Sequence, residues 1–188
     1  MKCFYINLDK SINRKINIEN NFLENNTSAW TLTRFSAIDV MYVENNKIEG
    51  ALRANEKACF LSHKFVIKEN INCEEPILVM EDDAIFGKST CAILDNFIKG
   101  SDKFEWDILF TDVGVGPEVM LDLINLRKRL SINQENTLLD LAKLQFFGAT
   151  SYILNPKSLK KVFNLLDENV LLNIPYDLYL RSLIRKQY

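Results

Sequence analysis

Short, continuously apolar segments alternate along this chain with longer segments whose apolar residues recur at helical spacing. Residues 77–80 (ILVM) are of the first kind, and residues 11–24 are of the second. A strand that is apolar on both sides is buried on both faces of its sheet, so helices must cover both faces. The alternation therefore predicts an α/β fold with one sheet between layers of helices.

The predicted elements follow one another without a linker, an internal repeat or a low-complexity tract, which favours a single domain over residues 1–188. Strands are expected at residues 3–8, 29–39, 77–80, 106–114 and 147–154. Helices are expected at residues 11–24, from 56 with Asn55 as the N-terminal cap, at 89–98, at 117–127, from Asn155-Pro156 onward, and after the sequence IPYD. Residues 40–53 are polar and are expected to be irregular.

Composition and charge exclude several classes of function. The net charge is −2, so there is no electrostatic case for binding nucleic acid. No apolar run approaches the ~20 residues that a membrane-spanning helix needs, and the N-terminus has no hydrophobic signal core, so we expect a cytoplasmic protein. The basic residues 127–129 are expected on a solvated helix face, and attraction to an anionic membrane surface is the alternative.

The four cysteines, Cys3, Cys59, Cys73 and Cys91, are scattered and form no C-x-x-C pair. In a cytoplasmic protein such cysteines are expected to be reduced and mostly buried. Because the chain also has a single histidine, no zinc site is expected.

Three consecutive carboxylates, Glu81, Asp82 and Asp83, directly follow the apolar run at 77–80. Ligands of open α/β sheets bind at the carboxyl ends of the strands, and Asp112 closes another predicted strand. Since side chains alternate along a strand, Glu81 and Asp83 are expected on the same side of it. Such a pair of carboxylates suits a hard cation, Mg²⁺ or Mn²⁺, and a solvated, inert acidic turn is the alternative.

Six motifs stand in order along the chain: FYINLDKSINR (4–14), FSAID (35–39), NEKACFLSHKFVIKE (55–69), PILVMEDDA (76–84), FGATSYILNPKSLKKV (147–162) and IPYDLYL (174–180). Together they resemble glycosyltransferase family 25, the group that includes bacterial lipooligosaccharide galactosyltransferases. The resemblance covers nearly the whole chain. It departs from the family pattern at Asn55, where a glycine often precedes the glutamate, and in ending at Tyr188, where many relatives continue.

The resemblance implies a fold and an activity. The implied fold is the glycosyltransferase A type, a Rossmann-like α/β/α sandwich. The implied reaction is inverting transfer of a hexose, most often galactose, from a UDP-sugar to a lipooligosaccharide or LPS core saccharide. That acceptor is lipid-linked, which implies peripheral association with the inner face of the inner membrane. Since the chain ends early, a catalytically inactive or truncated nucleotide-sugar-binding relic with a regulatory or interaction role is the alternative.

The resemblance also implies roles for individual residues. Asp83 is expected to bind the Mn²⁺ or Mg²⁺, and Glu81 to bind either the metal or the ribose. The donor nucleotide-sugar is also expected to contact Asn7, Leu8, Arg14, Asp39, Ser62, His63 and Asp82. A salt bridge to a helix acid is the alternative for Arg14. A structural role is the alternative for His63 and for Asp82, which is expected to face away from Glu81 and Asp83.

An inverting transferase needs a general base that removes the proton of the acceptor hydroxyl. Asp177, at the start of the last predicted helix, is the first candidate, and Asp112 is the second candidate for the base or an acceptor contact. The alternative role of Asp177 is that of a helix N-terminal acid favoured by the helix dipole. Tyr176 and Phe147 are candidates to stack on a sugar ring, although core packing is the expected use of Phe147.

Overall fold

Five strands form one mixed sheet in the order β2-β1-β3-β5-β4. The computed structural model describes residues 1–101, 105–133, 135–168 and 171–185. The strands are β1 (Lys2–Asn7), β2 (Thr31–Ser36), β3 (Ile77–Glu81), β4 (Ile108–Val115) and β5 (Phe146–Leu154). Strand β1 runs parallel to β2 and β3, whereas β5 runs antiparallel to β3 and β4. The carboxyl ends of β1, β2, β3 and β4 therefore lie at one edge of the sheet, which we call the rim.

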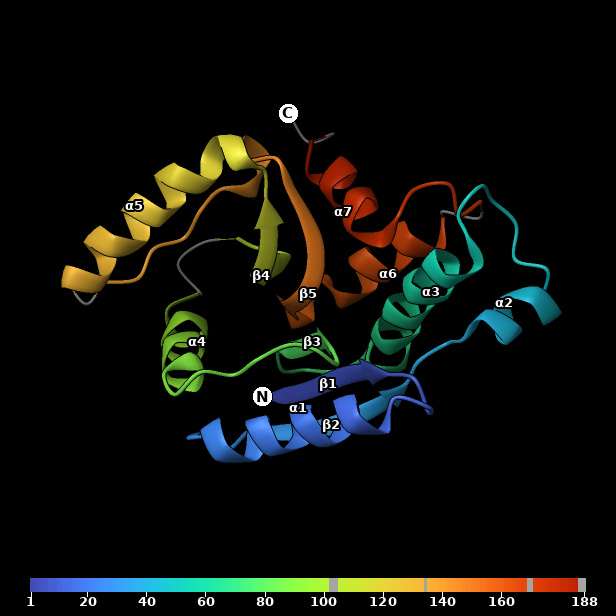
Figure 1. Ribbon diagram of the computed structural model, residues 1–188, viewed down its shortest axis with the longest axis horizontal. Coiled ribbons are helices and arrows are strands. Elements are labelled where there is room, and N and C mark those ends of the chain that lie inside the picture. The colour runs from blue at the N-terminus through green and yellow to red at the C-terminus, as the bar shows by residue number, and fades with distance from the viewer. Residues whose placement is uncertain (102–104, 134, 169–170, 186–188) are drawn as a thin grey trace.

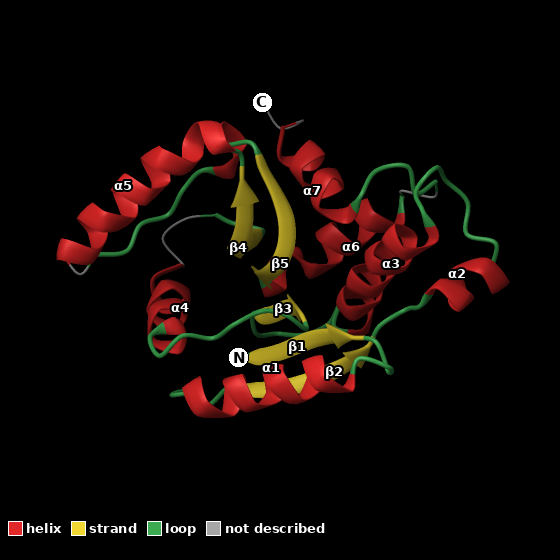
Figure 2. Cartoon of the chain, viewed as in Figure 1, coloured by secondary structure: helices red, strands yellow, loops and turns green. Residues whose placement is uncertain are grey.

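Helices cover both faces of this sheet (Figure 1, Figure 2). One core contains side chains of α3 (Ala54–Glu69), α6 (Leu159–Asp167) and α7 (Tyr176–Arg185). The other core contains side chains of α1 (Ile12–Asn25) and α4 (Thr90–Gly100). The remaining elements are α2 (Val40–Asn45), α5 (Pro117–Asn133), and the short 3-10 helices η2 (Leu141–Lys143) and η3 (Pro156–Ser158).

The two cores divide strand β3 between them. Ile77 and Val79 pack with α3, α6 and α7, and Leu78 and Met80 pack with α1 and α4. All four side chains are buried, and each contributes about 1.5–3 kcal/mol relative to an exposed position. The prediction of an α/β fold with helices on both faces is confirmed.

The structure corrects three of the predicted elements. Residues 40–45 form helix α2, because Asp39 caps it by accepting a hydrogen bond of 2.8 Å from the Tyr42 amide. Helix α3 begins at Ala54, and its cap is Arg53, whose amide donates to the Glu56 carboxylate, so Asn55 is not the cap. Helix α5 continues past the basic cluster to Asn133.

Helix α5 lies beside β4 and projects away from the sheet (Figure 1). None of its residues is fully buried, and it exposes four large apolar side chains, those of Met120, Leu121, Ile124 and Ile132. Within the described part of the chain, no helix combines the length and the apolar character that crossing a bilayer requires.

Candidate functional site

Asp82 is the centre of a hydrogen-bonded group at the rim. Its side chain is 8% exposed and accepts hydrogen bonds from the Asn7 side-chain amide at 2.7 Å and from the Arg14 guanidinium at 2.6 Å. Asn7 is buried as well, and its own side-chain oxygen accepts a bond of 2.9 Å from Arg34. Asn7 and Asp82 therefore join the ends of β1 and β3 and do not face solvent.

Arg14, in the first turn of α1, also contacts Asp83, with 3.0 Å between the guanidinium and a carboxylate oxygen. Its partners are thus two acids of the triplet, and not a helix acid. The guanidinium offsets the repulsion between two adjacent carboxylates. Asp83 remains 49% exposed, so it keeps oxygen surface for a ligand.

Glu81 and Asp83 do not lie on the same side, and this expectation from the sequence is wrong. Strand β3 ends at Glu81, and the Ala84 amide donates back to the Glu81 carbonyl at 3.3 Å, which closes a turn. The alternation of side chains holds only while the chain is extended. Glu81 therefore faces α3, whereas Asp83 lines a cavity on the α4 side of the sheet.

On the α3 side, Glu81 lies next to a buried aromatic network. One of its carboxylate oxygens is 3.6 Å from Nε2 of His63, whose side chain is 1% exposed. The other ring nitrogen of His63, Nδ1, is 2.9 Å from the Tyr152 hydroxyl, which in turn is 2.7 Å from the Tyr176 hydroxyl. The Tyr176 ring also stacks on the imidazole with 4.3 Å between centroids, so Tyr176 is not free to stack on a sugar.

The electrostatics of this side follow from its burial. The contact with His63 lowers the pKa of Glu81, against the opposing effect of burial. Burial raises the pKa of Tyr152, and also that of Tyr176. Burial raises the pKa of the Cys59 thiol to about 12, and the nearby charges of Glu81 and Asp177 add to this rise. Cys59 nevertheless remains in contact with solvent. At neutral pH, negative charge on this side therefore comes from carboxylates.

Asp177 stands in the first turn of α7, as predicted, and lies at the amino end of β5. One of its oxygens accepts a hydrogen bond of 2.7 Å from the Gly148 amide. Gly148 has a φ of 77°, a conformation that residues with a Cβ rarely adopt. Its neighbour Phe147 is 51% exposed and lies over Gly114, so the expected core packing of Phe147 is wrong.

On the α4 side, a cavity of about 260 Å³ is lined by five residues with oxygen-bearing side chains, namely Asp83, Thr90, Thr111, Asp112 and Ser151. The Thr111 hydroxyl donates to the Ser151 hydroxyl at 2.7 Å. Asp112 is exposed and forms no ion pair with another described residue. The cavity thus offers oxygen ligands, the kind that Mg²⁺ and Mn²⁺ prefer.

Three expected donor contacts have structural partners. The Ser62 hydroxyl is buried between the Ile38 amide, from which it accepts, and the Ala58 carbonyl, to which it donates. Asp39 caps α2, and the Leu8 carbonyl accepts a hydrogen bond from the Ser11 amide.

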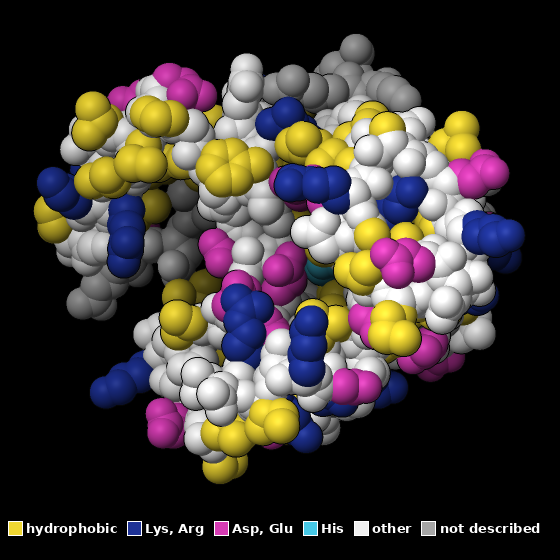
Figure 3. All heavy atoms as spheres, turned by 45° about the vertical axis from the view of Figure 1, so that its right-hand side comes forward, with side chains coloured by type: hydrophobic (Ala, Val, Ile, Leu, Met, Phe, Trp, Pro, Cys, Tyr) yellow, Lys and Arg dark blue, Asp and Glu magenta, His cyan; other side chains and the backbone are white. Residues whose placement is uncertain are grey.

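No local pattern indicated a role for Arg34 or Tyr152, since their partners in the structure are far away along the chain. Cys59 stands one helical turn before His63, and this spacing was a usable signal. Figure 3 shows acidic and basic side chains meeting around the hollow in the middle of the molecule, where the chain's one histidine is visible.

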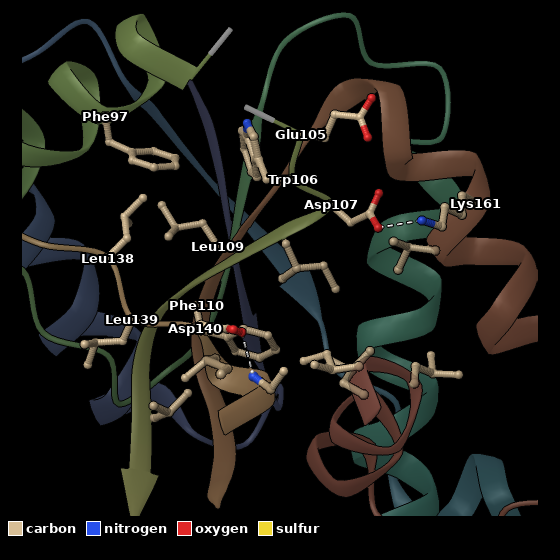
Figure 4. Close-up of a pocket in the computed structure, with 18 of the residues that line it drawn as sticks. Phe97, Glu105, Trp106, Asp107, Leu109, Phe110, Leu138, Leu139, Asp140 and Lys161 are labelled. Carbon is tan, nitrogen blue, oxygen red and sulfur yellow. Dashed lines mark hydrogen bonds and ion pairs between the residues drawn. The ribbon is translucent and has the colours of Figure 1, made fainter. Parts of the chain in front are cut away.

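A larger cavity, of about 740 Å³, lies between β4, residues 137–142 and helices α6 and α7 (Figure 4). Its wall is mainly apolar, and Lys161 forms an ion pair of 2.6 Å with Asp107 there. None of the candidate site residues lines it. A phosphate-bearing ligand needs charged or hydrogen-bonding partners, so the rim is the better candidate site.

Comparison with known proteins gives two findings. The sequence model of glycosyltransferase family 25, described as an LPS biosynthesis protein, matches residues 1–180. A search of curated proteins finds the lacto-N-neotetraose biosynthesis glycosyltransferase LgtE of Neisseria meningitidis serogroup B, 28% identical over 106 residues. The aligned part is 56% of this chain and 37% of LgtE, so it spans little more than a third of that relative.

Proposed function

This chain belongs to glycosyltransferase family 25, and on that premise we propose that it transfers a hexose from a UDP-sugar to a saccharide of LPS or lipooligosaccharide. Galactose is our first choice for the transferred hexose, and we propose that the configuration at its anomeric carbon is inverted. The observation that carries the proposal is the family match over residues 1–180, which includes every candidate site residue. The parallel strands β1, β2 and β3, with their carboxyl ends at one rim, support the glycosyltransferase A type of fold.

We place the diphosphate of the donor on the α4 side of the rim. Asp83 and Asp112 fit a hard cation there, because both carboxylates line one cavity and Asp83 keeps half of its surface exposed. These two residues would hold Mn²⁺ or Mg²⁺, which offsets the charge of the nucleoside diphosphate leaving group. Arg14, already against Asp83, is positioned to contact a phosphate oxygen.

Glu81 has a different role in this proposal. Its carboxylate faces α3, across the sheet edge from the cavity that Asp83 lines, so we assign it a ribose or sugar hydroxyl contact. Asp82 and Asn7 are buried and position the neighbouring side chains. His63 holds Glu81 in place and is itself held by Tyr152.

Asp177 is the general base in this proposal. Inversion requires the base on the face opposite the leaving group. Asp177 lies with Glu81 and Cys59 on the α3 side, whereas Asp83 and Asp112 share the cavity on the α4 side. The Gly148 amide holds one oxygen of Asp177, and the second oxygen takes the proton of the acceptor hydroxyl.

The acceptor we propose is a lipid-linked core saccharide at the inner face of the inner membrane. Helix α5 supports this choice, because its exposed apolar side chains share a helical face with Arg127 and Lys128. An apolar face with basic residues suits the surface of an anionic bilayer. Exposed Phe147, beside Asp177 at the rim, is positioned to stack on a sugar ring of the acceptor.

Titration of UDP, with and without Mn²⁺, tests the donor site. We expect Mn²⁺ to tighten UDP binding to the wild type, and Asp83→Asn to remove that effect. Asp122→Asn, an exposed acid on α5, is the matched control and should behave as the wild type. Equal UDP affinity in all these conditions would contradict the metal assignment.

A turnover assay then separates the enzyme from the inactive relic. UDP-galactose is offered alone, with a free core oligosaccharide, and with the same saccharide attached to lipid in vesicles. The proposal expects slow hydrolysis without acceptor and the fastest transfer to the lipid-linked form. Nucleotide binding with neither hydrolysis nor transfer would favour the inactive relic. Equal transfer rates to the free and the lipid-linked saccharide would contradict the proposal that the acceptor is membrane-bound.

A further inference from the structure

Cys59, His63 and Glu81 bring one ligand atom each, Sγ, Nε2 and a carboxylate oxygen, to within 4.8 Å of one another. Among the described residues, no other group of three or more histidine, cysteine, aspartate and glutamate side chains meets this criterion. From this geometry we propose that the three side chains bind a divalent cation that accepts sulfur ligands, with Zn²⁺ as the representative ion. This proposal goes against the expectation from the sequence, which was that the chain has no zinc site.

The backbone explains why the three side chains converge. Cys59 and His63 are four residues apart on α3, so they lie on one face of the helix, one turn apart. Glu81 is the last residue of β3, and it points to the same side as Ile77 and Val79, which pack against α3. Two ligands thus come from one rigid helix and the third comes from a buried strand.

The spacing suits one tetrahedral ion. Zinc binds nitrogen and oxygen at about 2.0 Å and sulfur at about 2.3 Å, so two ligand atoms on one ion lie roughly 3.3–3.8 Å apart. The His63 Nε2 and the nearest Glu81 oxygen are 3.6 Å apart, which is wide for a hydrogen bond and within a few tenths of an ångström of the ~3.3 Å that a nitrogen–oxygen pair on one zinc ion needs. Three protein ligands leave a fourth position, and Cys59 and Glu81, which both reach solvent, open that position to water.

The second ring nitrogen of His63 has the partner that a metal-binding histidine needs. Nδ1 is 2.9 Å from the Tyr152 hydroxyl, and Tyr152 is 2.7 Å from Tyr176. When Nδ1 carries the proton and donates it to Tyr152, the lone pair of Nε2 points toward Glu81. Such partners fix the tautomer and the ring orientation of metal-binding histidines.

The charge of the surroundings also favours a cation. The carboxylates of Glu81 and Asp177 act on the Cys59 thiol, and among the described residues no lysine or arginine acts with them. On binding, the Cys59 S–H bond breaks, the sulfur keeps the electron pair and bonds to the metal, and the proton passes to water. The metal charge then offsets the new thiolate and the Glu81 carboxylate.

This site is separate from the cation site proposed at Asp83. The cavity with Asp83 and Asp112 offers only oxygen atoms, whereas Cys59 and His63 offer sulfur and nitrogen, which zinc prefers over magnesium. The inference rests on the geometry at Cys59 and does not require the proposed transferase function.

Titration of the reduced full chain with Co²⁺ tests the site, because a cobalt–thiolate bond gives a near-ultraviolet charge-transfer band. We expect one band that saturates at one Co²⁺ per chain and disappears when Zn²⁺ is added. Cys59→Ser should lose the band and weaken Zn²⁺ binding more than about 100-fold, since even loss of an outer partner costs 10–100-fold. Tyr152→Phe should keep the band and weaken Zn²⁺ binding about tenfold.

Two control variants make the result decisive. Cys73 lies near the amino ends of the strands, so Cys73→Ser should keep the band. Asp83→Asn should keep it as well, because the two cation sites are independent. Circular dichroism confirms that each variant is folded. A wild type without the band, or a folded Cys59→Ser variant that retains it, overturns the proposal.

Discussion

Glu81 and Asp83, two residues apart in the chain, face the two sides of the rim, and these sides differ in almost every physical respect. On the α3 side, Glu81 contacts a buried histidine that is bonded to the Tyr152 hydroxyl and stacked on the Tyr176 ring. On the α4 side, Asp83 and Asp112 line a cavity together with three hydroxyl residues, Thr90, Thr111 and Ser151. One side is fixed by its surroundings, and the other keeps room for a ligand.

This difference shows how one acidic triplet can serve two purposes. Groups in a buried network have few alternative positions, because each hydroxyl or imidazole that loses its partner costs free energy. Groups on an open surface exchange partners with water at little cost. We therefore expect the α3 side to set geometry for proton transfer and the α4 side to accept the charged donor.

The largest expected effect is on the rate of transfer, and it distinguishes the α3 side of the rim from the α4 side. Asp177→Asn should lower the rate of transfer by about 10²–10⁴-fold, the usual contribution of a general base, and should leave UDP affinity unchanged. Asparagine keeps the shape of the side chain and an oxygen that accepts from Gly148. Steady-state kinetics together with UDP titration measure both quantities.

Asp112→Asn is the matched change on the α4 side. It should weaken Mn²⁺-dependent UDP binding, because it removes a charge from the cavity that Asp83 lines. If Asp112→Asn instead stops transfer and spares UDP binding, the base is on the α4 side and the assignment of the two sides must be reversed.

The second effect concerns stability. Tyr152→Phe should lower the free energy of unfolding by about 2–3 kcal/mol, because it leaves the buried Tyr176 hydroxyl and His63 Nδ1 without their partner. Ser151→Ala, the neighbouring change on the α4 side, should lower it by only about 0.5–1 kcal/mol, since exposed Thr111 can bond to water instead. Urea unfolding measures both, and equal losses would mean that the two sides are equally rigid.

The smallest expected effect tests Gly148, whose amide donates to Asp177, the proposed base. Gly148→Ala should lower the unfolding free energy by about 1 kcal/mol, because alanine is strained at a φ of 77°. Gly100→Ala, at the end of α4, should raise stability by up to about 1 kcal/mol, since no atom of the described residues outside its own helix lies within 4 Å of the added Cβ. Each change corresponds to a shift of about 2–4 °C in melting temperature for a chain of this size. A Gly148→Ala variant at least as stable as the wild type would show that a side chain at this position causes no strain.

Much of the fold could be predicted from local sequence patterns. The apolar run at residues 77–80 is a strand with both faces covered, and the helical pattern at 11–24 is a helix within one or two residues of its predicted bounds. Helix α2 was missed, because its six residues are too few for a periodic pattern and its cap, Asp39, was interpreted as a site residue. The antiparallel direction of β5 has no local signature either, since it depends on its pairing with β3.

The candidate site was predictable in outline and not in detail. The sequence predicted that acids follow the strands, and these acids do lie at one rim. It did not predict that Asn7 and Ser62 would be buried, or that Arg14 would pair with the triplet itself. Burial and pairing depend on which elements pack together, and that information is not local.

By itself, the sequence determined the α/β class, the family and the order of the acidic residues, because periodicity and motifs are properties of the chain read along its length. Only the tertiary structure decided which way each acid faces. The turn after β3 separates Asp83 from Glu81, and the packing of α3 on the sheet brings Cys59 and His63 to Glu81. Contacts between elements distant in the chain create the electrostatic environment of each acid, so identical carboxylates two residues apart acquire different chemistry.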